Sequence, residues 1–209
     1  MDKDNLNIEQ KDNQNMSAQN KKTEKNRSVL AYLHDLVYLL AGMLLVFLLL
    51  FRVVVVSGSS MYDTLVDGDY VLLLNNVFYF EPKQGDIVVV SKTTYHDGEP
   101  IIKRVIATEG QTVTIKNGVV SVNGVTLNES YLDEGTYTKA SITDDPIHIT
   151  VEEGHVFCLG DNREVSKDSR SSEIGQVDCR EIIGKAILIF LPRNTTAKGF
   201  DFGRFGGIN

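Results

Sequence analysis

Polar and apolar residues divide the N-terminal quarter of the chain into two contrasting stretches. Residues 1–27 are rich in Asn, Gln, Lys and Asp and contain few large apolar side chains. Because such a stretch cannot bury enough surface to offset its conformational entropy, we predict a disordered tail. No residue from Leu36 to Phe51 is charged, and Val53–Val56 continue the apolar run beyond Arg52. A strongly apolar segment therefore follows the tail.

The apolar run is long enough to cross a membrane as a helix. A bilayer core requires about 20 apolar residues, and Leu36–Val56 provides that length. The apolar core of a cleaved signal peptide is shorter, at about 7 to 15 residues, so we expect an uncleaved transmembrane anchor over residues 34–56. Arg52 lies near the outer end of the span, where its long side chain can extend to the interface.

Basic residues before the span predict its orientation. Those nearest to the apolar run are Lys21, Lys22, Lys25 and Arg27. An excess of Lys and Arg marks the cytoplasmic side of a membrane helix. We therefore expect a single-pass protein of the cell membrane, with residues 1–27 in the cytoplasm and a domain of residues 57–193 outside it. Residues 194–209 are expected to form a C-terminal tail.

The outer domain has the pattern of β-structure. Runs rich in Val, Ile, Leu and Thr are broken by turn residues, and long helical periodicity is absent beyond the apolar segment. The runs are Asp69–Asn75, Asp86–Lys92, Ile101–Thr108, Thr112–Lys116, Gly118–Gly124, Ile147–Val151, His155–Leu159 and Ile182–Leu191. Asn117–Gly118 and Asn123–Gly124 are turn signals typical of β-hairpins. We predict a mainly β domain, from which the polar, acidic segment Asn128–Pro146 is an excursion.

Composition narrows the classes of partner and site. The formal net charge of -7 and the pI near 5.1 argue against nucleic acid as a partner, since phosphate binding requires a basic face. The sequence has no CxxC or HExxH motif and its four histidines are scattered, so we expect no metal site. Cys158 and Cys179 are too few for a disulfide-rich scaffold. A disulfide between them and two buried free thiols are both compatible with the sequence.

Two short stretches supply a candidate serine and a candidate lysine, one each. The first, "SGSSMYDTL" at residues 57–65, is compatible with a flexible linker or with an active-site loop. A serine hydroxyl is a poor nucleophile unless a base removes its proton, and no histidine here lies in a motif-like setting. The second stretch, "IIKRVIA", contains Lys103. In a strand, Ile101 and Val105 would lie on the same face as Lys103.

An apolar sheet face is the setting that a lysine base requires. A lysine must be neutral to accept a proton, and burial lowers its pKa by penalising the charged form. A shift from about 10.4 to near 7 corresponds to roughly 4 to 5 kcal/mol. The alternative interpretation of Lys103 is an exposed lysine on a strand at the sheet edge.

A third stretch, "GDNREVSKDSRSSEIGQV" at residues 160–177, concentrates charge among serines and glycines. One interpretation is a solvated polar loop. In the other, a tight turn at Gly160 and fixed ion pairs direct hydroxyl groups toward a shared point. The charged residues concerned are Asp161, Arg163, Asp168 and Arg170.

Together, and in this order behind an N-terminal anchor, the three stretches resemble the type I signal peptidases. These are membrane-anchored serine peptidases that remove signal peptides from exported proteins. The resemblance extends from the anchor to Pro192 and implies Ser60 as nucleophile, with Lys103 as general base. The supporting residues that it implies are Gly58, Met61, Arg104, Asp161, Ser166, Asp168 and Arg170.

The resemblance also implies individual roles. Ser166 corresponds to the hydroxyl that positions the lysine, whereas Asp161, Asp168 and Arg170 correspond to structural ion-pair residues. Some members carry an oxyanion-binding serine at the position of Gly58. With glycine there, we expect backbone N–H groups to stabilise the oxyanion instead.

The family fold implies a mostly antiparallel β domain whose exposed edge pairs with an extended substrate. The implied substrates are signal peptides of exported preproteins, with small residues before the cut in an Ala-X-Ala-like pattern. An apolar rim on the lipid bilayer and proximity to the secretion translocon are further implications. No cofactor is implied.

Asp63 stands where the family usually has proline. Its carboxylate can cap a turn. If it lies near the ammonium of Lys103, it raises the pKa of that lysine and the enzyme requires a more alkaline medium.

Two other functions remain as alternatives. One is a catalytically silent, membrane-tethered β domain that binds exported proteins, for which Asp63 is the only support. The other is a self-cleaving repressor-type peptidase, which shares the serine/lysine dyad. The anchor and the "GDNR" stretch argue against the second alternative.

Overall fold

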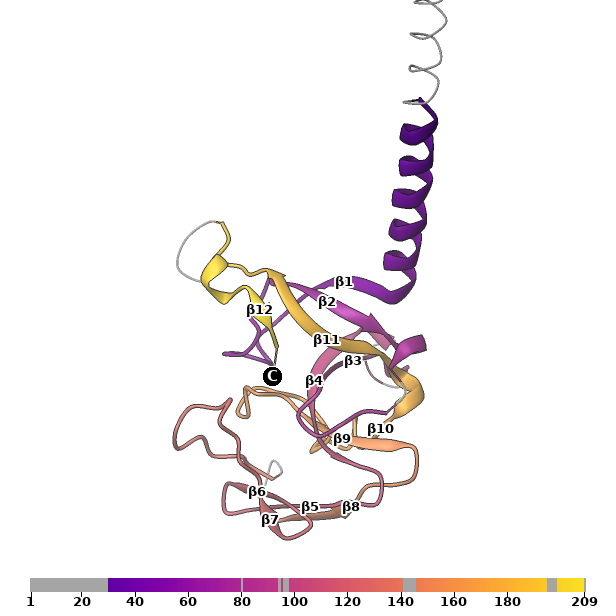
Figure 1. Cartoon of the computed structure of the whole chain (residues 1–209). Helices are drawn as coiled ribbons and strands as arrows, with labels where there is room; N and C mark the ends of the chain where they lie inside the picture. Colours follow the sequence, from indigo (N-terminus) through magenta and orange to yellow (C-terminus); the bar gives the residue numbers. More distant parts are fainter. Residues whose placement is uncertain are drawn as a thin grey trace, which may run out of the picture. The chain divides into compact units, whose positions relative to one another are not determined.

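The computed structural model of the chain describes residues 30–79, 81–93, 95, 98–140, 146–194 and 199–208. The chain divides into two compact units, one up to Leu48 and one from Leu49 onward (Figure 1). The tail predicted over residues 1–27 lies outside the described residues, as does His96.

A helix of 21 residues, Leu30–Leu50, begins the described chain. Its most apolar stretch has a mean hydropathy of 2.3, and it is the one helix among the described residues that is long and apolar enough to cross a membrane. The predicted helical range of residues 34–56 is corrected, because Phe51–Val55 forms strand β1. The β-branched valines of this segment favour extended backbone, and β1 pairs along its whole length with β2.

The second unit is mainly β, as predicted. Its strands are β1 (Phe51–Val55), β2 (Tyr70–Asn75), β3 (Ile87–Val90), β4 (Ile101–Thr108), β5 (Thr112–Lys116), β6 (Val119–Val122), β7 (Val125–Thr126), β8 (Ile147–Thr150), β9 (His155–Leu159), β10 (Val177–Asp178), β11 (Ile182–Leu191) and β12 (Gly206–Gly207). Its described 3-10 helices are η1 (Asn76–Phe78), η3 (Cys179–Glu181) and η4 (Phe202–Arg204). Each predicted run contains one strand, whereas β1, β7, β10 and β12 were not predicted.

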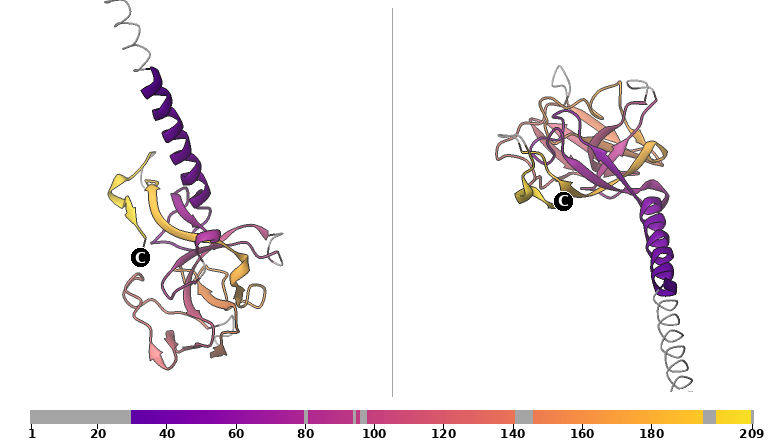
Figure 2. Two further views of the ribbon diagram at one scale, coloured as in Figure 1. Left: turned by 45° about the vertical axis from the view of Figure 1, so that its right-hand side comes forward. Right: turned by 90° about the horizontal axis from the view of Figure 1, so that it is seen from above.

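Two antiparallel sheets build this domain (Figures 1 and 2). The larger sheet has the order β1-β2-β11-β3-β4-β9-β10, and β12 pairs with β11. β11 therefore lies between β2 and β3, although it comes much later in the chain. The smaller sheet has the order β7-β6-β5-β8.

Asparagine–glycine turns connect the strands of the smaller sheet. Asn117 and Gly118 join β5 to β6 with φ values of 52° and 79°, and Asn123 and Gly124 join β6 to β7 with 53° and 79°. Two successive residues with positive φ are the signature of the type I′ turn, whose twist matches that of the flanking strands. Both predicted turns are confirmed.

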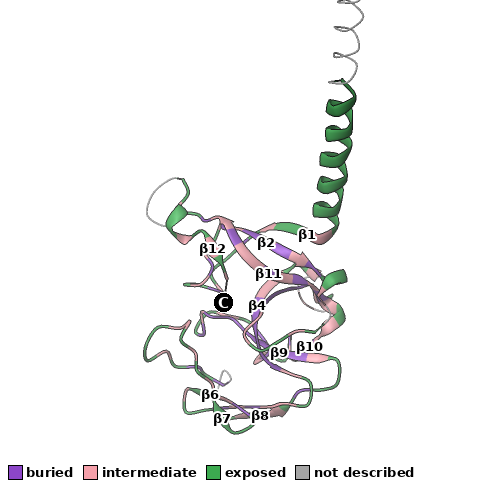
Figure 3. Cartoon of the chain, viewed as in Figure 1, coloured by how far each residue is buried: buried purple, intermediate pink, exposed green. Residues whose placement is uncertain are grey.

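Three apolar clusters form the core, and Figure 3 shows buried residues along the strands of the larger sheet. One cluster, between β2, β3 and β11, includes Met61 and Leu65 from the β1–β2 connection. Another, on β3, β4 and β9, contains Val88, Val105 and Cys158. These two clusters fix the elements that carry the candidate serine and lysine.

The residues after β11 fold back onto the domain, which corrects the predicted C-terminal tail of residues 194–209. Leu188 and Ile189 of β11 pair with the two glycines of β12. Ile208 packs against the cluster between β2, β3 and β11. Because glycine strands carry no pattern of apolar side chains, this pairing leaves no sequence signal.

Candidate active site

Ser60 lies in the connection between β1 and β2. The backbone N–H of Leu65 donates to the carbonyl oxygen of Met61 at 2.8 Å, which makes a helical turn directly after Ser60. Met61 and Leu65 are 1% and 0% exposed, and their spacing of four residues places both on one face of that turn. We call Ser60–Leu65 the serine turn. Its burial of two apolar side chains attaches Ser60 firmly to the core.

Lys103 lies near the middle of β4, opposite Val88 of β3. Its Nζ lies 2.8 Å from Ser60 Oγ and donates to the carbonyl oxygen of Ile102 at 2.9 Å. The residue is only 3% exposed. Of the two interpretations of this lysine, the structure therefore supports the buried one.

Burial lowers the pKa of Lys103 from 10.5 to about 8. Desolvation is the main cause, and the charges of Asp168 and Asp161 oppose it by favouring the ammonium form. Asp63 is not among the groups that act most strongly on this lysine. The expectation that Asp63 raises the pKa of Lys103 is therefore not supported, because carboxylates of the third stretch act on it instead.

The third stretch follows β9 and contacts the serine turn directly. The backbone N–H of Asn162 donates to the carbonyl oxygen of Ser60 at 3.0 Å, and Asn162 Nδ2 donates to that of Ser59 at 3.0 Å. At Gly160, a Cβ atom would lie 2.5 Å from the Ser60 carbonyl oxygen and 2.1 Å from Ser166 Oγ. Only glycine permits this close approach.

Arg104 and Asp161 form a buried bidentate ion pair. Arg104 Nε and Nη2 donate to the two oxygens of Asp161 at 2.9 and 2.8 Å, and both side chains are 1% exposed. The guanidinium also donates to the carbonyl oxygen of Gly85 and lies 3.8 Å from the ring centroid of Tyr131. Thr64 Oγ1 donates to Asp161 at 2.6 Å. The pair thus joins β4, the third stretch and the serine turn.

Asp168 and Arg170 form the second ion pair of this stretch. Arg170 Nε and Nη2 donate to the two Asp168 oxygens at 2.8 Å each. Asp168 also accepts a hydrogen bond from the backbone N–H of Gly160 at 3.0 Å. The stretch is therefore a set of fixed ion pairs rather than a solvated polar loop.

Ser166 lies near the backbone of Ser60 but makes no hydrogen bond to Lys103. Its Oγ is buried and has no hydrogen-bond partner among the described residues. The expected bond between Ser166 and Lys103 is therefore not formed in this structure. The space next to Gly160 nevertheless places this hydroxyl group near the Ser60 backbone.

The sequence of this site and its surroundings matches a known protein family. The model of the family described as signal peptidase, peptidase S26, matches residues 29–191. The chain belongs to the signal peptidase family. Because the members of that family are serine peptidases, the protein is a hydrolase, and the resemblance seen in the sequence is confirmed.

Named relatives agree with this assignment. Signal peptidase I of Bacillus licheniformis is 32% identical over 190 residues, covering 87% of this chain and 98% of the relative. Signal peptidase I T of Bacillus subtilis (strain 168) is 36% identical over 150 residues, covering 69% and 76%. A crystal structure of a signal peptidase I from Enterococcus faecalis V583 is 30% identical, with a TM-score of 0.41, and covers 50% of this chain and 96% of that chain.

Sequence reasoning missed several residues at the site of this signal peptidase. Arg163, seen only as one charge of the third stretch, is 3% exposed and donates to Glu129, to Thr138 Oγ1 and to the carbonyl oxygen of Gly160. Glu129 and Thr138 come from the acidic excursion, whose polar composition gave no sign of a contact with the third stretch. Asn162 belongs to the "GDNR" motif, which is the signal that could have identified it.

Gly58 adopts a conformation that favours glycine. Its φ is +88°, in the region that residues with a side chain rarely adopt. Its N–H donates to Asp67 Oδ1 at 2.9 Å. No heavy atom lies within 4 Å of the place that a Cβ would occupy, so backbone conformation rather than space selects glycine.

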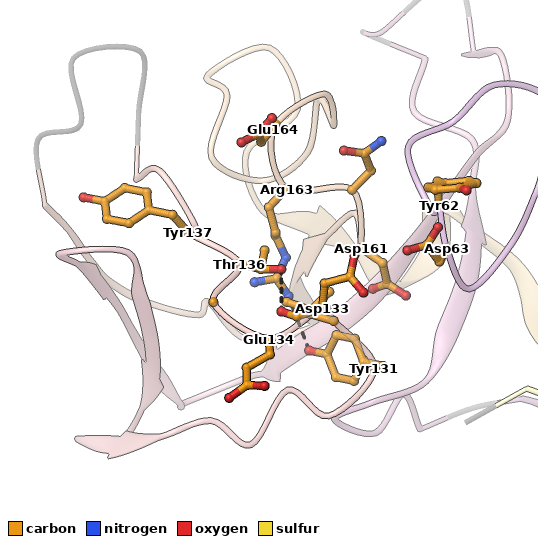
Figure 4. Close-up of a pocket in the computed structure, with 13 residues that line it drawn as sticks. Tyr62, Asp63, Tyr131, Asp133, Glu134, Thr136, Tyr137, Asp161, Arg163 and Glu164 are labelled. Atoms are coloured by element: carbon orange, nitrogen blue, oxygen red, sulfur yellow. Dashed lines mark hydrogen bonds between the residues drawn. The ribbon is translucent and has the colours of Figure 1, made fainter.

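A cleft of about 410 Å³ lies beside the serine turn (Figure 4). Tyr62 and Asp63 line one side, and residues 131–137 and 161–164 line the rest. Asp63 is exposed there. The hydrogen bond and charge of Asp63 raise the pKa of Tyr62, which shows that this carboxylate acts on its neighbour in the turn.

No metal cluster and no disulfide occur in the part of the chain that the structure describes. Cys158 is a buried free thiol, and Cys179 is a partly buried one. Burial raises the pKa of the Cys158 thiol. Of the two possibilities that the sequence left open, the structure has the free thiols.

The depressed pKa of Lys103 predicts the pH dependence of this signal peptidase. If Lys103 is the general base, only its neutral amine can accept the proton of the serine, so kcat/KM should rise about tenfold per pH unit below about pH 8 and level off above it. The measurement is kcat/KM for a signal-peptide substrate from about pH 5 to about pH 10. Asp63→Asn should leave the midpoint of this pH profile unchanged. A shift of the midpoint to lower pH in that variant would show that Asp63 does raise the pKa of Lys103.

Proposed function

We propose that this protein is a membrane-anchored endopeptidase that cleaves N-terminal signal peptides from exported preproteins, with Ser60 as nucleophile and Lys103 as general base. The observation that carries the proposal is the 2.8 Å distance between Lys103 Nζ and Ser60 Oγ in a site where the lysine is 3% exposed. The names of the relatives, signal peptidase I, support the substrate.

The proposed reaction uses one base twice. Neutral Lys103 accepts the proton of Ser60 Oγ while that oxygen attacks the carbonyl carbon of the scissile peptide bond. Backbone N–H groups, including that of Ser60, donate to the developing oxyanion. The protonated lysine then gives its proton to the leaving amine. Water, deprotonated by the same lysine, hydrolyses the acyl-enzyme and releases the signal peptide.

The substrate class follows from the family. We expect an extended segment with small side chains in an Ala-X-Ala-like pattern before the cut. The test is incubation of the detergent-solubilised protein with a labelled preprotein, followed by sequencing of the new N-terminus. A new N-terminus directly after such a pattern supports the proposal, and an intact preprotein contradicts it.

The alternative function, a catalytically silent β domain, rests on Asp63 alone. An effect of Asp63 on the charge of Lys103 does not add to that support. The carboxylates that act most strongly on Lys103 are Asp168 and Asp161, and the pKa of the lysine is nevertheless lowered to about 8.

We further propose that the helix Leu30–Leu50 anchors the protein in the lipid bilayer of the cell membrane, near the secretion translocon. The basic residues before the helix support a cytoplasmic N-terminus. Protease added to sealed right-side-out vesicles should digest the domain after Val56 and spare residues 1–27. Protection of the large domain would reverse this orientation.

A further inference from the structure

Thr64 contacts two ion pairs, one buried and one partly exposed. Its hydroxyl donates to Asp161, which is the partner of Arg104, at 2.6 Å. Its carbonyl oxygen accepts a hydrogen bond from Arg204 Nη2 at 3.3 Å. Arg204 in turn is the partner of Asp69. The side chain and the backbone of Thr64 are therefore each attached to an arginine–carboxylate pair.

The ion pair of Arg204 and Asp69 is bidentate, like that of Arg104 and Asp161. Arg204 Nη1 and Nη2 donate to the two Asp69 oxygens at 3.0 and 2.8 Å. Asp69 has a fully buried side chain, and it also accepts hydrogen bonds from the backbone N–H groups of Val66 and Arg193 at 2.8 and 2.7 Å. The carboxylate thus joins the end of the serine turn to the chain that follows β11.

Arg204 reaches this position because the C-terminal segment is folded. It ends the helix η4, and the next residues enter β12, which pairs with β11. Ile208 attaches the segment to the core. The segment lies beyond residues 29–191, the part of the chain that the family match covers.

We propose that Arg204 is a positioning residue that holds the serine turn in the geometry needed for catalysis. Its hydrogen bond holds the Thr64 carbonyl, while Asp161 holds the Thr64 hydroxyl, and so keeps Ser60 Oγ within reach of Lys103 Nζ. Misplacement of a reacting group by about 1 Å can cost about 100-fold in rate. The inference rests on the proposed function, because it assumes that Ser60 is the nucleophile.

The test compares Arg204→Gln with Arg204→Lys and Ile208→Ala in the full-length, detergent-solubilised protein. Glutamine cannot donate to both Asp69 oxygens and to Thr64, so kcat for a labelled preprotein should fall roughly 10- to 100-fold with KM nearly unchanged. Arg204→Lys should restore part of kcat. Ile208→Ala loosens the same segment without removing these hydrogen bonds, so kcat should stay near that of the parent protein while Tm falls.

The outcomes separate this inference from the proposed function. If Ser60→Ala is inactive and Arg204→Gln keeps the kcat of the parent protein, Arg204 has no positioning role and the nucleophile assignment stands. If Ile208→Ala loses as much kcat as Arg204→Gln, the segment contributes only stability and the inference fails. If Ser60→Ala remains active, the proposed function itself is wrong.

Discussion

Replacement of Ser60 by alanine is expected to abolish cleavage of a preprotein while the domain remains folded. The hydroxyl lies 2.8 Å from Lys103 Nζ, and its loss removes the atom that would form the acyl-enzyme. We expect kcat to fall by about 10³-fold or more, as for other serine peptidases that lose the nucleophile. The measurement is single-turnover cleavage, with thermal unfolding as the check on folding.

Lys103→Ala should have an effect of similar size. When two residues act as one catalytic unit, the loss of either removes most of what the unit contributes to the rate. Ser59→Ala is the matched control, since it removes the hydroxyl of the preceding residue and leaves its carbonyl oxygen for Asn162. We expect that variant to keep most of its activity. An inactive Ser59→Ala together with an active Ser60→Ala would show that Ser60 is not the nucleophile.

Asp161→Ala is expected to reduce the stability of the domain strongly. It leaves the guanidinium of Arg104 buried without its carboxylate, and both side chains are 1% exposed in the structure. Removal of one partner of a buried ion pair typically costs 3–5 kcal/mol, so we expect a loss of about 4 kcal/mol in the free energy of unfolding. Thr64 also loses its acceptor, so activity should fall at temperatures where the domain is still folded. Urea unfolding measures the first effect.

Arg180→Ala is the control for that prediction. It breaks the ion pair with Asp178, in which the arginine side chain is 90% exposed. Exposed ion pairs contribute little because water screens them. We therefore expect almost no change in the urea midpoint. If Asp161→Ala lowers the free energy of unfolding no more than Arg180→Ala does, burial does not make the Arg104–Asp161 pair important for stability.

The sequence predicted those elements whose signal is local. The strands β4, β5, β9 and β11 have the predicted bounds, since each is an apolar, β-branched run flanked by turn residues. The two asparagine–glycine turns are likewise determined by residues that tolerate positive φ. For Lys103 the sequence left a buried and an exposed interpretation open, and the buried one follows from Val105 in the cluster on β3, β4 and β9 and from Ile101 packed against it.

Elements that depend on a distant partner were not predictable. Phe51–Val55 continues the apolar run of the helix before it, so the start of strand β1 became visible only through its pairing with β2. The two glycines of β12 carry no hydrophobic pattern at all. The ion pair of Asp69 and Arg204 joins residues far apart in the chain, and Arg204 lies beyond Pro192, where the resemblance to the family ends.

The placement of β11 has a consequence for the order in which the enzyme becomes active during its synthesis. Ser60 lies on the connection of the β1–β2 hairpin and Lys103 on the β3–β4 hairpin, and β11 is the strand that lies between the two hairpins. A nascent chain that has not yet extended through Leu191 holds both residues but lacks the strand that brings their hairpins together. We therefore expect Ser60 and Lys103 to come within reach of each other only after β11 has been made.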